Sequence, residues 1–129
     1  MNPAPSAPSA GAGALNVSDE PFRDDARRLR ISGTLDWNNF HVVDDALRRL
    51  FDAGQSRIVI DLAGTTFISS AGFGCFISGL DVALKLGGNL VFLNVPPAIR
   101  EIFQILGLSR ILRFAENEEE ALRVLTSTP

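Results

Sequence analysis

Two short apolar runs constrain the fold of this chain more than any other sequence feature. Residues 57–62 (RIVIDL) and 89–95 (NLVFLNV) are nearly continuous stretches of β-branched and large apolar side chains. Runs of this length and composition are typical of strands buried on both faces, and such strands belong to sheets that helices cover. The segment between the two runs must cross over the sheet, which predicts a parallel pair joined by a helix.

The segments around these runs have the spacing of amphipathic helices. Apolar residues recur three and four positions apart over residues 40–51, 73–84 and 99–106. Glycine follows each stretch, as expected at a helix end. Residues 116–125 predict a last, acidic helix, whose glutamates favour the positive end of the helix dipole.

Further strands are predicted at both ends of the pattern. Residues 28–35 alternate between apolar and polar side chains, which indicates a half-buried strand. A short edge strand near residues 15–17 and another at 111–114 complete the set. The sequence therefore predicts one α/β domain over residues 14–127, with a mixed four- to five-stranded sheet covered by about four helices.

Composition excludes several classes of protein. Residues 1–13 are almost wholly Pro, Ala, Ser and Gly, so we expect a disordered tail with no signal-peptide character. No run of about 18 apolar residues follows that would insert in a membrane, and we expect a cytoplasmic protein. The net charge of −3 gives no general attraction to nucleic acid.

The chain also lacks the residues of common active sites. It has one cysteine, Cys75, and one histidine, His41, too few for a disulfide, a zinc site or histidine-based catalysis. We expect Cys75 in the core and His41 on the surface. The glycine and lysine patterns of nucleotide-binding loops are absent. We therefore expect no catalytic residue, no metal and no cofactor.

Hydroxyl groups gather where function is expected in such a sheet. The predicted strands end at Leu35, Leu62 and Val95, along one edge of the sheet. The predicted loop after Leu62 contains Thr65, Thr66, Ser69 and Ser70, and its end is also the start of the second helix. Ser69 or Ser70 is then a simple helix cap, or an exposed hydroxyl that holds or receives a phosphate. A loop that binds a small ligand or a nucleotide phosphate is a further alternative.

Charged residues in the strands have simpler interpretations. Arg27, Arg28 and Arg30 form a small basic patch, which we expect to be solvated on the wet strand face. Asp61 lies within a buried run. We expect its carboxylate to accept hydrogen bonds from the loop backbone near Thr65 or Thr66.

The order of five motifs resembles that of a STAS domain, the module shared by sulfate transporters and bacterial anti-sigma factor antagonists. The similarity extends from about residue 28 to the end of the chain. The motifs are GTLD at 33–36, IVIDL at 58–62, FISSAGF at 67–73, NLVFLNV at 89–95 and LGL at 106–108.

This resemblance implies a switch protein that is not an enzyme. Ser70 matches the usual phosphoacceptor of anti-sigma factor antagonists, and Ser69 is a possible second site. The implied partners are a serine kinase that is itself the anti-sigma factor, bound when Ser70 is unmodified, and a PP2C-type phosphatase that reverses the modification. The expected partner interface consists of Asp36, Trp37, Asn38, Ser69, Ser70, Gly72 and Phe73.

The chain departs from the usual pattern at three positions. Many members have an acidic residue before the phosphoacceptor and a second Ser or Thr after it, whereas this chain has Ser69 and Ala71. Trp37 is also unusual, and it fits an interface anchor or a cap over one end of the core. A constitutive STAS scaffold subunit of a lipid-transport ABC system or a signalling assembly, with Ser70 only a cap, therefore remains an alternative function.

Overall fold

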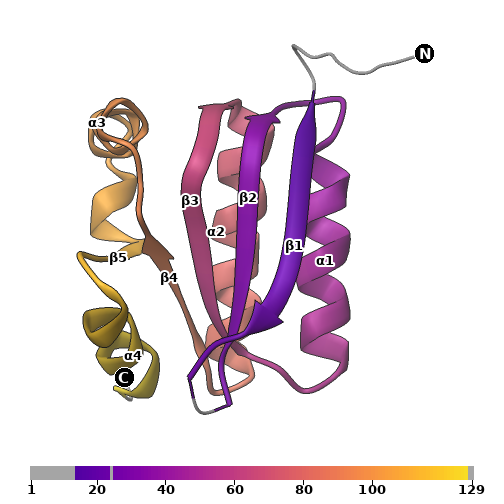
Figure 1. Cartoon of the computed structure of the whole chain (residues 1–129), viewed down its shortest axis with the longest axis vertical. Coiled ribbons are helices and arrows are strands. Elements are labelled where there is room, and N and C mark those ends of the chain that lie inside the picture. Colours follow the sequence, from indigo (N-terminus) through magenta and orange to yellow (C-terminus); the bar gives the residue numbers. More distant parts are fainter. Residues whose placement is uncertain (1–13, 24, 128–129) are drawn as a thin grey trace.

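A five-stranded mixed sheet is the framework of the computed structural model, which describes residues 14–23 and 25–127 (Figure 1). The strands lie in the order of the chain, β1-β2-β3-β4-β5. β1 is antiparallel to β2, and all later neighbours are parallel. The tail expected at residues 1–13 lies outside the described residues. The strands are β1 (Leu15–Pro21), β2 (Arg27–Leu35), β3 (Arg57–Ile68), β4 (Asn89–Leu93) and β5 (Arg113–Ala115).

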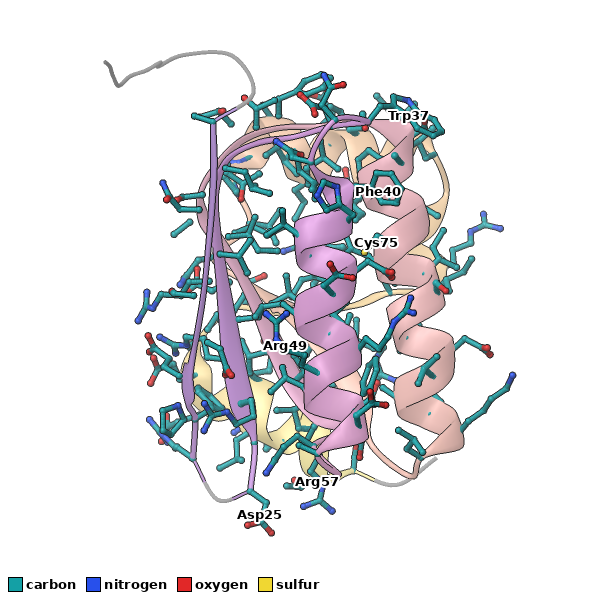
Figure 2. The ribbon with its side chains drawn as sticks, turned by 90° about the vertical axis from the view of Figure 1, so that its right-hand side faces the viewer. Asp25, Trp37, Phe40, Arg49, Arg57 and Cys75 are labelled. Atoms are coloured by element: carbon teal, nitrogen blue, oxygen red, sulfur yellow. The ribbon has the colours of Figure 1, made fainter. Side chains whose placement is uncertain are left out.

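Four helices connect and cover these strands, which confirms the predicted α/β class. α1 and α2 lie side by side on one face of the sheet (Figures 1 and 2). Among the described residues, no helix has the length and apolar character needed to cross a bilayer. The helices are α1 (Phe40–Asp52), α2 (Ser70–Lys85), α3 (Pro97–Ile105) and α4 (Glu118–Thr126), and a 3₁₀ turn, η2, covers Leu108–Arg110.

The two faces of the sheet carry cores of different size. The larger core lies under α1, α2 and α3, where Phe92 of β4 packs at 5.0 Å from Phe76 and 5.4 Å from Phe103, measured between ring centroids. The smaller core lies under α4 and includes Val91 and Leu93. β4 is therefore buried on both faces, as its apolar run predicts.

The segment predicted as a loop after Leu62 is a strand. β3 continues to Ile68 and stays paired with β2 up to the Leu35–Ile68 pair, with two irregularities in the register. The threonines contribute to this pairing, because Thr65 Oγ1 donates to the carbonyl oxygen of Ile31 at 2.7 Å and Thr66 Oγ1 to that of Gly33 at 3.1 Å. The predicted strand end at Leu62 is wrong, and the edge of the sheet where function was expected lies at Leu35 and Ile68.

Other boundaries also differ from the prediction. β1 has seven residues instead of a short segment at 15–17, since it pairs with β2 over its whole length. β4 ends at Leu93, not Val95, where Asn94 takes a positive φ of 58°. The last strand is at residues 113–115 instead of 111–114, because η2 occupies the preceding turn.

The basic patch expected on the wet face of β2 is only partly solvated. Arg30 is exposed, but Arg28 is buried and forms ion pairs with Glu118 of α4 and with Asp61 of β3. Its guanidinium also lies 5.1 Å from the centroid of the Phe22 ring. Burial of Arg28 follows from the position of α4, which begins directly over it.

Candidate functional site

The start of α2 is fixed to the carboxyl ends of β2 and β3. The backbone N–H of Ser69 donates to the carbonyl oxygen of Leu35 at 2.8 Å, and the N–H of Phe73 donates to that of Ser69 at 3.1 Å. Gly72 lets the helix approach the sheet closely, since a Cβ at this position would lie 2.7 Å from Cγ2 of Ile68 and 2.8 Å from Cδ2 of Leu35. The first turn of α2 therefore has little freedom to move.

Ser70 is the first residue of α2 and is exposed. The residues below it are buried: Phe73 packs edge-on against Phe103 of α3 at 4.9 Å between ring centroids. An exposed side chain on a fixed helix start is accessible to another protein, and modification there does not require the core to open.

Ser69 occupies the cap position of α2 without acting as a side-chain cap. Its backbone is extended, and its side chain accepts no hydrogen bond from the first turn of the helix. The Oγ atom is buried and has no hydrogen-bond partner among the described residues. The first turn also has no acidic residue. The interpretation of this serine pair as a simple side-chain cap is therefore not supported, and the first turn of α2 supplies no negative charge of its own to the positive end of the helix dipole.

A fixed turn presents Trp37 next to this helix start. Asp36 Oδ1 accepts from the N–H of Asn38 at 2.9 Å, and Asn39 Oδ1 accepts from the N–H of Asp36 at 2.8 Å. Trp37 is 68% exposed and touches the edge of Phe40, with 6.1 Å between ring centroids. Figure 2 shows both aromatic side chains at the end of the molecule where α2 begins. Trp37 is thus a surface residue and does not cap the core.

Sequence reasoning missed Phe67, a second exposed aromatic residue at this edge. It is 51% exposed and lies in register with Thr34 of β2, three residues before Ser70. Its aromatic character beside the serines was the available signal, but it lay in a segment predicted as a loop. We use the name Ser70 surface for the exposed or half-exposed residues at this edge, which are Asp36, Trp37, Asn38, Phe67, Ser69 and Ser70.

Two members of the predicted interface lie beneath the Ser70 surface. Gly72 and Phe73 are buried, so their part is to hold α2 in place. His41 is exposed on α1, and Cys75 is buried as expected. Burial, and next the nearby charge of Asp44, raise the pKa of the Cys75 thiol to about 12, which removes its nucleophilic character at neutral pH.

Asp61 belongs to an ionic cluster under α4 and not to the Ser70 surface. Its carboxylate accepts from the N–H of Ala63 at 3.0 Å and from Asn94 Nδ2 at 3.2 Å, and Arg30 Nη1 lies 3.4 Å away. The expected hydrogen bond from the backbone is present, but its donor is Ala63, two residues before Thr65. In residues 14–23 and 25–127, no group of three or more His, Cys, Asp or Glu side chains is arranged to hold a metal ion.

Comparisons with known proteins find a matching family model and several relatives of this chain. Residues 18–113 match the family model described as "Mlab, STAS domain". The chain is 30% identical to a putative anti-sigma factor antagonist, BtrV, of Bordetella bronchiseptica over 91 residues, which are 70% of this chain and 78% of that protein. It is 26% identical to the anti-sigma-B factor antagonist of Staphylococcus epidermidis over 106 residues, covering 81% of this chain and 98% of the relative.

Solved structures show the same fold. An anti-sigma factor antagonist from Mycobacterium paratuberculosis superposes with a TM-score of 0.76 at 20% identity, covering 88% of this chain and 96% of that one. The Bacillus cell fate determinant SpoIIAA in its phosphorylated form gives a TM-score of 0.65 at 23% identity, with 84% and 99% covered.

Proposed function

This chain belongs to the STAS domain family, and we propose that it is an anti-sigma factor antagonist controlled by phosphorylation of Ser70. In its unmodified form it binds an anti-sigma factor that is also a serine kinase. The observation that carries the proposal is the start of α2, where an exposed serine lies on a fixed helix turn without a side-chain cap or acidic residue. Relatives that are named anti-sigma factor antagonists support the choice of partner.

A phosphate on Ser70 is compatible with the fold. It adds roughly −1.5 to −2 charges at pH 7. At the start of a helix, a negative charge stabilises by about 0.3 to 2 kcal/mol. Because the first turn of α2 has no acidic side chain of its own, no carboxylate within that turn repels the phosphate. The protein should therefore keep its structure when modified.

The interface with a partner responds differently to the same phosphate. A partner that covers the Ser70 surface must bury the hydroxyl together with Trp37 and Phe67, two exposed aromatic side chains of the kind that anchor interfaces. Burying a phosphate there without a matching cation costs desolvation and like-charge repulsion, and each 1.4 kcal/mol lowers affinity about tenfold. One modification therefore separates a binding form from a non-binding form.

In this function the chain works as a switch in the cytoplasm and performs no catalysis itself. The kinase is supplied by the anti-sigma factor, and a PP2C-type phosphatase restores the hydroxyl. Ser69 is a poor second acceptor, because its Oγ atom is buried beneath the surface that Ser70 exposes.

Phosphorylation of the purified chain tests the proposal. Incubated with ATP and the kinase-fold protein that the unmodified chain captures, it should gain one phosphate, which mass spectrometry places on Ser70. Ser70→Ala should abolish the modification, whereas Ser69→Ala, the matched control, should still be modified. Phosphate on Ser69, or no phosphate with a kinase that binds, contradicts the proposal.

A constitutive scaffold subunit is the second candidate, favoured by the "Mlab, STAS domain" description of the matching family model. The same surface would then bind the ATPase of a lipid-transport system, with Ser70 unmodified. Capture of a transporter ATPase instead of a kinase selects this alternative. The small-ligand alternative has weaker support, since Thr65 and Thr66 donate their hydroxyl protons to strand carbonyls.

A further inference from the structure

α3 exposes large apolar side chains on the side that faces away from the core. Ile99 and Phe103 are buried, and the sequence spacing predicts that Ile102 and Leu106 join them. The structure instead leaves Ile102 38% and Leu106 55% exposed, and Ile105 between them is 74% exposed. Ile111, just after η2, is 52% exposed. We name these four residues, Ile102, Ile105, Leu106 and Ile111, the α3 patch.

The α3 patch lies at the same end of the molecule as the Ser70 surface. α3 follows the carboxyl end of β4, and Figure 1 shows it at the end of the sheet where α2 begins. The contact between Phe103 and Phe73 joins α3 to the first turn of α2, with 4.9 Å between ring centroids. A partner that covers the Ser70 surface can therefore extend across to α3.

The charges around the α3 patch differ from those of the whole chain. Residues 97–114 contain three basic residues and one acidic residue, a net charge of +2 in a chain whose net charge is −3. Arg100 is already engaged, since it pairs with Glu116 at 3.4 Å and lies 4.7 Å from the centroid of the Phe114 ring.

Arg110 and Arg113 are both exposed, and neither forms an ion pair within the described part of the chain. The single carboxylate of this segment, Glu101, also lies on the exposed side of α3. Because it is only one carboxylate against three basic side chains, the segment keeps its net positive charge, which favours an acidic partner. In the sequence, Arg110 directly precedes Ile111 of the patch, and Arg113 follows two residues after it. Exposed apolar side chains accompanied by two guanidinium groups fit a protein segment with apolar side chains flanked by carboxylates.

We infer that the α3 patch is a second docking area for the anti-sigma factor kinase, receiving an apolar segment with acidic flanks. This inference rests on the proposed function, but the patch is not expected to respond to the phosphate. Phosphorylation of Ser70 disrupts one half of a two-part interface and leaves the other half intact. The kinase then holds its product weakly, which allows release without complete loss of recognition.

Substitution of the patch tests this inference. Ile105→Ser with Leu106→Ser should weaken binding of the captured kinase by tenfold or more, measured by calorimetry, with an unchanged melting temperature because both side chains are exposed. Leu86→Ser is the matched control, since Leu86 is 53% exposed at the opposite end of α2 and should have no effect. Arg110→Glu with Arg113→Glu should weaken binding and reduce its dependence on salt concentration.

The outcomes separate the inference from the proposed function. If the patch variant binds the kinase as tightly as Leu86→Ser does, the inference is overturned, and the phosphorylation test still decides the switch. If the patch variant loses binding while phosphate on Ser70 has no effect, the switch fails and the docking area stands. A patch variant that only converts a dimer to a monomer, or only releases the chain from phosphatidylglycerol vesicles, also overturns the inference.

Discussion

The starts of α2 and α4 differ in how their side chains compensate the unpaired backbone N–H groups of a helix N-terminus. α4 supplies its own cap and its own negative charge: Asn117 Oδ1 accepts from the N–H of Glu120 at 2.8 Å, and three glutamates lie in its first turn. α2 has neither a side-chain cap bond nor an acidic residue in its first turn. A helix start that its own side chains satisfy has a structural task, whereas one left open can accept a charge that arrives later.

The two helix starts are also held to the sheet by different interactions. Glu118 of α4 forms an ion pair with the buried Arg28, which fixes the helix over the sheet. At α2, apolar packing fixes the backbone and the serine side chain stays exposed. We therefore expect substitutions at α4 to change stability, and a negative charge introduced at Ser70 of α2 to change binding.

The largest effect on stability is expected at Arg28. Arg28→Ala removes a buried cation that lies 3.8 Å from Asp61, itself buried in the sheet. Loss of one partner from a buried ion pair costs about 3 to 5 kcal/mol of unfolding free energy, measurable by urea denaturation. The control is Arg23→Ala, because Arg23 pairs with Glu118 at the surface and should contribute less than about 1 kcal/mol. Equal losses would show that α4 is not fixed through Arg28.

A smaller effect is expected where α2 approaches the sheet. Gly72→Ala places a methyl group within 3 Å of Ile68 and Leu35, and this overpacking should cost about 1 to 3 kcal/mol. Gly74→Ala, two residues on, meets nothing within 4 Å and should stabilise the helix by roughly 0.5 to 1 kcal/mol. Thermal melts of both variants check the difference in sign. A Gly72→Ala variant as stable as Gly74→Ala would contradict the fixed helix start.

Replacing the cap residue with alanine should lower the free energy of unfolding more at α4 than at α2. Asn117→Ala removes the side-chain bond at α4 and should cost about 1 kcal/mol. Ser69→Ala removes a hydroxyl that caps nothing and has no hydrogen-bond partner in the described part of the chain, so its cost should lie within about 0.5 kcal/mol. Chemical denaturation of the two variants measures both values. A Ser69→Ala loss equal to that of Asn117→Ala would mean that α2 depends on its serine as α4 depends on its asparagine.

The smallest expected effect is a change with pH in the stabilisation that Glu118 provides. The hydrogen bond and charge of Arg28 lower the pKa of Glu118 from its ordinary value. Stabilisation from a carboxylate with a lowered folded-state pKa is present above the unfolded pKa and is lost as pH falls through the folded value. Glu118→Gln should therefore lower the melting temperature at pH 7, and the difference from the unchanged chain should shrink toward pH 3. A constant difference across this range would exclude the ion pair as the cause.

The sequence predicted the parts of this fold that depend on local pattern. The apolar run was sufficient to predict β4, and the spacing of apolar residues was sufficient to predict α1 and α2. In both cases the buried positions repeat regularly along the chain. Residues 63–68 were missed as a strand, since the carbonyl groups that accept from Thr65 and Thr66 lie 33 to 34 positions earlier. Burial of Arg28 likewise depends on Glu118, 90 positions away.

The candidate site shows the same division. Family resemblance in the sequence predicted Ser70 as the phosphoacceptor, which stays a prediction, and it did not show that the hydroxyl of Ser69 is buried. Exposure of Phe67 and of the α3 patch depends on which side chains the neighbouring elements leave uncovered. Exposure of this kind depends on contacts between elements and leaves no repeating pattern in the sequence.

The affinity of the captured kinase for the unmodified chain and for the Ser70-phosphorylated chain is the most direct test of the switch. Both forms should have the same circular dichroism spectrum, and the phosphorylated form should melt at the same temperature or slightly higher. Its dissociation constant should be at least tenfold larger, and Ser70→Asp should shift in the same direction by a smaller factor, since a carboxylate carries less charge. Equal dissociation constants for the two folded forms would contradict the account.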